Sequence, residues 1–297
     1  MVPEDKVEET FNTQLQKCGV EYFDYYLLHN LNRFIYEGQV KETHLFEYMR
    51  KWKEEGKIHH IGFSFHDDAK TLDKILYEHS EVEFVQIVIN YYDWDELFIQ
   101  SKKCYEVIRK HNCKVVVMEP VKGGTLARVP EAALDKMHEL NALATPSSYA
   151  IRYASSFDGV LTVLSGMSNM EQVRDNVSYM ENFESLNNKE REVLDFTKKE
   201  IMKTWKFQSD NLELMDDNKY SVPLSHIIRA YNSIMIQPNP GFSAELNYYK
   251  SFRSDYDRAF ETADYSRFND QVGFDVNATL KEAIDYQVKN SFQSYVD

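Results

Sequence analysis

The sequence has few glycines, prolines and cysteines, and it lacks a long apolar run. Ten glycines and 7 prolines among 297 residues exclude a low-complexity chain or a string of linkers. The cysteines, Cys18, Cys104 and Cys113, suit a reducing cytoplasm better than a disulfide framework. No apolar run approaches the roughly 20 residues of a membrane-spanning helix. The polar N-terminal sequence MVPEDKVEET is unlike a signal peptide. We therefore expect a cytoplasmic protein without a membrane partner.

Basic residues are also in deficit. The chain has 34 Lys and Arg against 48 Asp and Glu, which gives a net charge of −14. Proteins that bind nucleic acids normally present a basic face, so we expect no nucleic-acid partner. Hydrophobic residues, by contrast, make up 43% of the sequence, and aromatic residues make up 14%. That content supports a substantial core in one or two domains.

Five short apolar runs predict buried β-strands, at residues 22–29, 58–63, 83–90, 114–119 and 160–165. Helical periodicity lies between and around them, at residues 3–19, 45–56, 72–79, 105–108, 173–177, 225–236 and 278–295. The runs from residue 24 to residue 160 are spaced by about 34 residues, the size of a βα unit. This alternation predicts a parallel sheet with helices packed outside it.

The predicted strands end in polar or small residues. His29 ends the first run, Ser64 follows the second, Asn90 ends the third, Glu119 ends the fourth and Gly166 follows the fifth. In parallel α/β folds, ligands bind at the carboxyl ends of the strands. We therefore expect the chemistry at this rim.

Five motifs at these strand ends resemble the aldo-keto reductase family, in family order and spacing: FDYYLLH (23–29), GKIHHIGFSFH (56–66), FVQIVINYYD (84–93), VVVMEPVKGGTLA (115–127) and VLSGMSNMEQVRDNV (163–177). The resemblance covers about residues 5–200 and is closest to the branch with a C-terminal iron–sulfur tail. It implies a (β/α)8 barrel that binds NADP or NAD. It also implies an oxidoreductase that transfers hydride between the nicotinamide and a small carbonyl or alcohol substrate.

The resemblance also implies a partial barrel. FDYYLLH corresponds to the family's fourth strand, so residues 1–204 are predicted to hold the equivalents of strands four to eight, followed by a mainly helical tail at 205–297. The family's catalytic Asp, Tyr and Lys belong to earlier strands and have no counterpart here, so the isolated chain is expected to be impaired. The alternative is a non-catalytic barrel remnant that binds a cofactor or a partner, or self-associates through open sheet edges.

Three residues correspond to the substrate and nicotinamide side of the family site. His29 stands where the family's catalytic His orients the carbonyl by a hydrogen bond. Ser64 and Gln86 match residues that hold the nicotinamide amide, whose donors and acceptor suit hydroxyl and carboxamide groups. The family often has Asn directly after the Ser, whereas this chain has Phe65 and then His66.

Two loops correspond to the rest of the cofactor site. After the fourth run, the predicted contacts are Pro120, Lys122, Gly123, Gly124 and Leu126. Glycine pairs let backbone amides approach a pyrophosphate, and a lysine adds charge. At the last barrel helix, the predicted contacts are Gly166, Met167, Ser168, Asn169, Gln172 and Asn176, and Asp175 could also contact the adenine side.

The start of the last barrel helix has two interpretations. Ser168 with Glu171 fits a capping box, which needs no ligand. The same helix start could instead hold the adenosine phosphate. Arg174 is the one basic residue nearby in the sequence, so NADP and NAD stay open.

No metal site is expected. His59 and His60 would point to opposite faces of a strand. The tail resembles segments that accompany iron–sulfur clusters, but it has no cysteine after Cys113. Such clusters need thiolate ligands, so we predict none.

Overall fold

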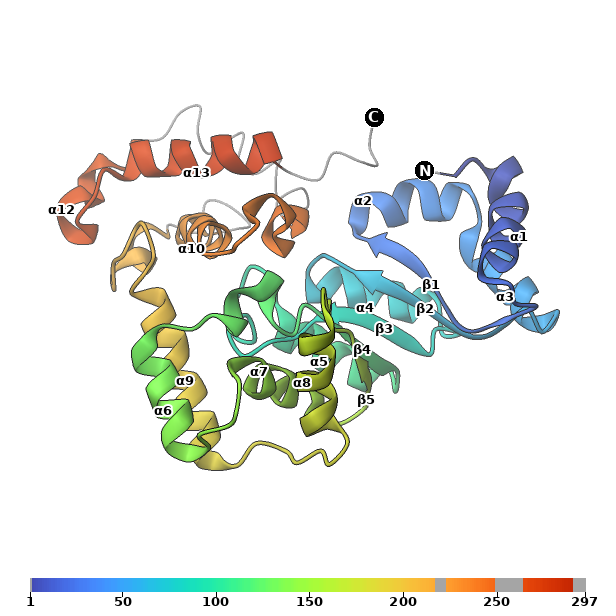
Figure 1. Ribbon diagram of the computed structural model, residues 1–297. Helices are drawn as coiled ribbons and strands as arrows, with labels where there is room; N and C mark the ends of the chain where they lie inside the picture. The colour runs from blue at the N-terminus through green and yellow to red at the C-terminus, as the bar shows by residue number, and fades with distance from the viewer. Residues whose placement is uncertain (1, 217–222, 249–263, 291–297) are drawn as a thin grey trace.

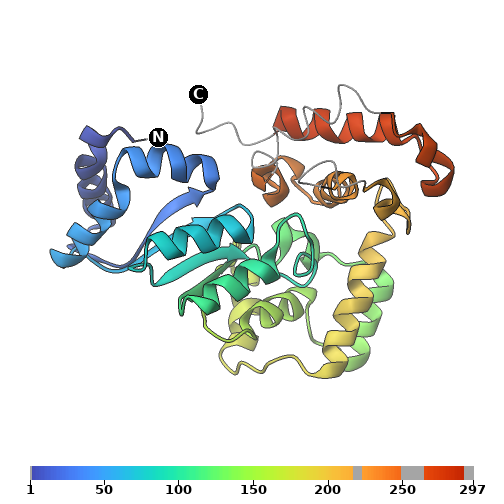
Figure 2. The ribbon, with the colours of Figure 1, turned by 180° about the vertical axis from the view of Figure 1, so that it is seen from behind.

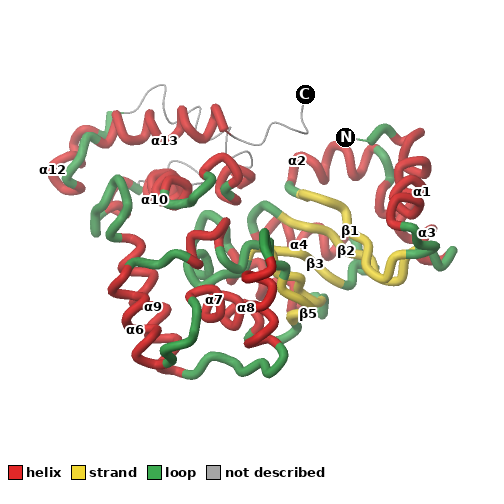
Figure 3. Tube along the Cα trace, in the orientation of Figure 1, coloured by secondary structure: helices red, strands yellow, loops and turns green. Residues whose placement is uncertain are grey.

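The computed structural model describes residues 2–216, 223–248 and 264–290, and its centre is a parallel sheet (Figure 3). The strands run in the order β1-β2-β3-β4-β5, each parallel to its neighbour. Their bounds are Phe23–Leu31 (β1), Ile58–Phe65 (β2), Phe84–Val88 (β3), Lys114–Met118 (β4) and Val160–Val163 (β5). The five predicted strands and their parallel arrangement are confirmed.

Helices alternate with the strands, as Figure 1 shows. In the region up to residue 202 the α-helices are Val7–Cys18 (α1), Arg33–Ile35 (α2), Leu45–Glu54 (α3), Ala69–Glu78 (α4), Ser101–Lys110 (α5), Glu131–Leu140 (α6), Pro146–Ser155 (α7), Met170–Met180 (α8) and Asn188–Met202 (α9). Shorter turns are the 3-10 segments Glu4–Lys6 and Lys122–Ala127 and the π segment Tyr36–Val40. The predicted helices α1, α3, α4, α5 and α8 are confirmed, whereas the sequence did not predict α2, α6, α7 and α9.

The first helix shows how the sequence specifies a local structure. Val7, Phe11 and Leu15 are the buried residues of α1, at the spacing of one helical face. Gly19 ends the helix with φ 65°, a left-handed conformation that glycine adopts without steric cost. The Phe11 ring stacks on Trp52 of α3 with 3.9 Å between centroids, which holds the two helices together on one side of the sheet.

The strand at each edge of the sheet is hydrogen-bonded on one side only, among the described residues. At the β5 edge, strand β5 with α7 and α8 borders an apolar groove of about 490 Å³. Leu161, Met167 and Val177 line it and are each at least 40% exposed. Edge strands with exposed apolar neighbours are surfaces to which further strands add.

The C-terminal region is helical, as predicted. Its helices are Leu224–Met235 (α10), Asn269–Val272 (α12) and Val276–Asn290 (α13), with 3-10 turns at Leu212–Met215, Pro240–Phe242 and Ser266–Phe268. The predicted helix at 225–236 is confirmed, and so is the one at 278–295 as far as residue 290; its last five residues lie outside the described ranges. Figures 1 and 2 show α10 and α13 together on one side of the molecule, with the pair α6 and α9 next to them.

The tail packs on the carboxyl side of β3 and β4. Trp205 Nε1 donates a hydrogen bond of 2.8 Å to the Tyr92 hydroxyl, just after β3. Lys122, just after β4, forms an ion pair with Glu245 of the tail. The tail therefore covers part of the rim where the sequence predicts a cofactor.

None of the helices in the described ranges is long and apolar enough to cross a membrane. Within the same ranges, no group of three or more His, Cys, Asp and Glu side chains is placed to hold a metal ion.

Candidate functional site

His29, Ser64 and Gln86 lie on one face of the sheet. Tyr25 of β1 stacks on His60 of β2 with 4.6 Å between centroids, so both side chains point to the same face. Side chains alternate along a strand, so the even spacing from His60 brings Ser64 back to that face. His29 follows Tyr25 at the same even spacing on β1, next to the shift in register between Leu28 and Leu31. Ser64 pairs with Gln86 in the register of β2 and β3. The three predicted residues therefore form a row across three neighbouring strands.

The three side chains in this row differ in exposure and in the hydrogen bonds they already form. His29 is exposed, whereas Ser64 is fully buried and its Oγ accepts a 2.7 Å hydrogen bond from the Asn30 backbone N–H. Gln86 is half-buried, and its Nε2 contacts Met118 Sδ at 3.4 Å. His29 and Gln86 therefore keep polar atoms for a ligand, while Ser64 retains only the hydroxyl proton as a donor.

His66 adds a buried imidazole next to this row. Its backbone N–H donates to Leu31 O, which fixes it at the joined ends of β1 and β2. Burial, followed by the nearby His29, lowers the pKa of His66 to about 3, so the ring is neutral at physiological pH. Tyr248 of the tail meets the ring edge-to-face with centroids 6.0 Å apart. The sequence had indicated neither residue as part of the site, because Tyr248 arrives there from a distant segment.

Buried polar atoms without hydrogen-bond partners gather in the segments that follow β1 to β4. Five of the seven such atoms among the described residues lie at or after the ends of these strands: Asn30 Oδ1, His66 Nδ1, Tyr91 OH, Glu119 Oε2 and Thr125 Oγ1. The other two, Ser101 Oγ and Gln287 Oε1, lie on α5 and α13. Buried polar atoms are nearly always paired in native proteins, and exceptions often mark water or ligand sites. The polar rim therefore fits a polar ligand such as a nucleotide cofactor.

The loop after β4 has the backbone that the sequence predicts. Gly123 and Gly124 have φ values of 58° and 96°, in the left-handed region where other residues are strained. Lys122 before them is also left-handed, with φ 47°. The N–H groups of Lys122, Gly124 and Leu126 donate to backbone carbonyls of Glu119 and Val121, so these three are already used within the loop.

The Lys122 side chain differs from the prediction. Its Nζ is fully buried and lies 2.8 and 2.9 Å from the two carboxylate oxygens of Asp93 and 2.5 Å from Glu245 Oε1. Burial alone would lower the pKa of Lys122, but the two carboxylates raise it above its ordinary value. Both carboxylates already hold the ammonium, so the predicted contact of Lys122 with a phosphate would require one of them to move away.

Two other predicted contacts in this loop are inaccessible. Pro120 is buried, and Leu126 is fully buried within the hydrophobic core. Apolar side chains at these positions stabilise the loop by packing. Their side chains therefore offer no exposed surface to a cofactor in this structure.

The segment before α8 is exposed, but the helix begins later than predicted. Asn169, not Ser168, is the N-cap: its backbone is extended and its side chain accepts from Gln172 N at 2.9 Å. The predicted capping box of Ser168 with Glu171 is therefore wrong. Gln172 Oε1 accepts from Ser168 N, and Asn176 contacts Ser165 and Tyr179. Gly166 and Met167 are exposed, so the predicted adenosine side stays accessible.

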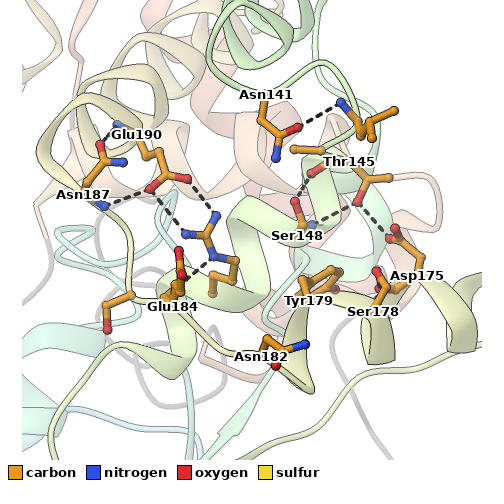
Figure 4. A pocket seen from close by; sticks show the side chains of 14 residues that line it. Asn141, Thr145, Ser148, Asp175, Ser178, Tyr179, Asn182, Glu184, Asn187 and Glu190 are labelled. Carbon is orange, nitrogen blue, oxygen red and sulfur yellow. Dashed lines mark hydrogen bonds and ion pairs between the residues drawn. The ribbon is translucent and has the colours of Figure 1, made fainter.

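A polar cavity of about 450 Å³ lies elsewhere, between α7, α8 and the start of α9 (Figure 4). Thr145 donates to Asp175 at 2.8 Å, and Arg152 pairs with Glu190 at 2.7 Å. The Arg152 guanidinium is thus held by a carboxylate and is not presented to a phosphate. Of the residues predicted to contact the cofactor, only Asp175 lines this cavity among the described residues, and Thr145 already holds its carboxylate, so the cavity is not the predicted site.

The burial of the Glu119 carboxyl at this rim should make the stability of the protein depend on pH. Burial raises the pKa of its carboxyl to about 8, so the carboxyl is protonated in the folded protein at neutral pH. The unfolded chain releases this proton near its ordinary pKa of 4.5. Between these values the unfolded state binds fewer protons, so this carboxyl makes stability fall as pH rises from about 4.5 to about 8.

We expect Glu119→Gln to flatten that decline. At pH 8 the variant should be more stable than the unmodified chain, by on the order of 3 kcal/mol, while at pH 4.5 the two should be alike. Urea unfolding followed by circular dichroism across this pH range measures the difference. Glu171→Gln, at an exposed position on α8, serves as the control. Equal pH slopes for Glu119→Gln and the unmodified chain would contradict the expectation.

Comparisons with known proteins point to one family. The model of the Aldo/keto reductase family matches residues 3–195. No curated protein matches the chain. Among solved structures, an aldo-keto reductase from Bacillus halodurans is 24% identical with a TM-score of 0.52, over 65% of this chain and 67% of that one.

Two further solved structures are similar. A glycerol dehydrogenase from Gluconobacter oxydans is 18% identical, with a TM-score of 0.52 over 65% of this chain and 64% of that one. An aldo-keto reductase from Klebsiella pneumoniae in complex with NADPH is 20% identical, with a TM-score of 0.50 over 64% and 63%. At these identities the structures show the fold, and the chain spans about two thirds of their length.

Proposed function

Since this chain belongs to the aldo/keto reductase family, we propose that it serves an NAD(P)-dependent oxidoreductase reaction on a small carbonyl or alcohol. The observation that carries the proposal is the row of His29, Ser64 and Gln86 beside a rim of unpaired polar atoms. The NADPH complex of a similar fold supports a nicotinamide cofactor. NADP and NAD are both retained.

The residues of the row have separate tasks in this proposal. When bound, the nicotinamide supplies or accepts the hydride. The exposed His29 imidazole donates a hydrogen bond to the substrate oxygen and orients it. Gln86, with the Ser64 hydroxyl, holds the carboxamide of the nicotinamide, and the backbone at Gly123 and Gly124 lies where phosphates would approach.

We propose that the isolated chain is a poor catalyst. The resemblance assigns the proton-donating Tyr and its Lys and Asp partners to strands that precede the equivalent of β1. His29 can orient a carbonyl, but a bound alkoxide also needs a proton donor of matched pKa. Binding of the dinucleotide is therefore a better test than turnover.

The second proposal is a non-catalytic role in which the open sheet edge binds another chain. The apolar groove beside β5, with Leu161, Met167 and Val177 exposed, favours it. Light scattering on a size-exclusion column tests it: dimers or larger assemblies support pairing through the edge. A monomer at all concentrations would contradict self-association.

Two further features belong to the proposal. We propose a cytoplasmic location and a division into a barrel portion, 1–204, and a tail, 205–297. The net charge of −14 and the small-molecule site favour a substrate of low molecular weight over nucleic acid.

Titration with NADPH and NADH, followed by nicotinamide fluorescence, tests the cofactor proposal. We expect Gln86→Leu to weaken binding about tenfold, because two hydrogen bonds to the carboxamide are lost. Gln16→Leu, at an exposed position on α1, makes the same chemical change away from the site and should leave the affinity unaltered. Absence of binding at millimolar dinucleotide would contradict the proposal.

A further inference from the structure

The tail covers the Gly123–Gly124 loop, where the cofactor phosphates are proposed to bind. We propose that segment 233–248 is an intramolecular strap on the Gly123–Gly124 loop, that Glu245 and Lys122 form its latch, and that a dinucleotide binds only when the strap lifts. This inference rests on the proposed function, because it names what competes for the proposed phosphate site.

The latch is a closed network of charges. Lys122 Nζ bridges Asp93 of the barrel portion and Glu245 of the tail, with all three side chains at most 2% exposed. The two carboxylates therefore neutralise the positive charge of Lys122 inside the protein. A phosphate at the loop would have to share it with two carboxylates already in contact.

The tail prepares Glu245 for this contact. Its carboxylate accepts hydrogen bonds from Ser233 at 2.6 Å and from Gln237 at 3.1 Å, and also from Ser243. Burial acts to raise the pKa of Glu245, but Lys122 and the hydroxyls of Ser233 and Ser243 together hold it below its ordinary value. Glu245 is therefore a fixed negative charge aimed at the loop.

The strap also fills the space next to the glycines. A β-carbon at Gly123 would lie 3.1 Å from Gln237 Oε1, and one at Gly124 would lie 3.9 Å from Pro238 Cγ. A pyrophosphate that approached this side of the loop would meet the Gln237 carboxamide and, behind it, the Glu245 carboxylate. Steric exclusion and repulsion of like charges therefore act together against a dinucleotide while the strap is docked.

Removing the latch charge should favour the dinucleotide. Glu245→Gln keeps the size of the side chain and leaves Asp93 to neutralise Lys122. We expect this variant to bind NADPH about tenfold more tightly than the unmodified chain. Glu213→Gln removes a charge from an exposed position of the same tail, 65% exposed, and should leave the affinity unchanged.

Hydrogen exchange provides a second measurement that needs no variant. In the unmodified chain, saturating NADPH should speed exchange in residues 233–248, while α1, at the opposite end of the molecule in Figures 1 and 2, stays unchanged. If Glu245→Gln does not fold, this measurement decides alone. Slower or equal exchange in 233–248 on binding would overturn the strap.

The outcomes separate the strap from the cofactor proposal. If neither the unmodified chain nor Glu245→Gln binds NADPH or NADH at millimolar concentration, the cofactor proposal fails and the strap with it. If both bind with equal affinity and exchange in the tail does not change, the strap alone fails. Tighter binding by Glu245→Gln with faster exchange supports both.

Discussion

Replacement of Lys122 by methionine should reduce the free energy of unfolding by about 3–5 kcal/mol, because two buried carboxylates lose their counter-charge. Asp93 and Glu245 remain, and each is at most 2% exposed, so water cannot solvate them in place of the ammonium. Methionine has a similar length and keeps most of the packing. Urea unfolding at pH 7, followed by circular dichroism, measures the loss.

Two comparisons isolate the charge in this experiment. Lys103→Met, at an exposed position on α5, should change stability by less than about 0.5 kcal/mol. Adding Asp93→Asn and Glu245→Gln to Lys122→Met should recover most of the loss, since no unpaired charge is then buried. If the triple variant is no more stable than Lys122→Met alone, the loss comes from packing and not from charge.

Replacement of Phe11 by alanine should cost about 3–5 kcal/mol, because the ring is the centre of an aromatic cluster. It is fully buried, stacks on Trp52 at 3.9 Å and meets Tyr26 edge-to-face at 5.2 Å. Its removal leaves a cavity between α1, α3 and β1. A shift of the urea midpoint with an unchanged slope would show that stability alone has changed.

An exposed aromatic residue serves as the matched control. Tyr77 on α4 is 84% exposed, and Tyr77→Ala should change stability by less than about 0.5 kcal/mol. A loss below about 1 kcal/mol for Phe11→Ala would mean that α1 does not depend on this cluster.

Local sequence patterns were sufficient to predict the strands and several of the helices. Val7, Phe11 and Leu15 predict the buried face of α1, and Gly19 predicts its end. The helices α6, α7 and α9 were not predicted, although their buried residues also recur at helical spacing, for example Tyr149 and Tyr153 in α7 and Leu194 and Ile201 in α9.

The candidate site was predictable in part. Motif resemblance identified His29, Ser64 and Gln86, and the strand register pairs Ser64 with Gln86. It could not identify Tyr248, which meets His66 from the tail across a long separation in sequence. It also could not show that Asp93 and Glu245 hold Lys122, because these carboxylates come from distant segments.

The sequence by itself determined the βα rhythm, the family and the polar rim, because these depend on residues that are near neighbours along the chain. Only the tertiary structure decided which charges on the rim are free. Asp93, Lys122 and Glu245 come from three distant segments, and their contact exists only after the tail has packed on the strand ends. The sequence shows which side chains carry a charge. Whether a charged group can bind a ligand depends on its burial and on the partner that folding places beside it.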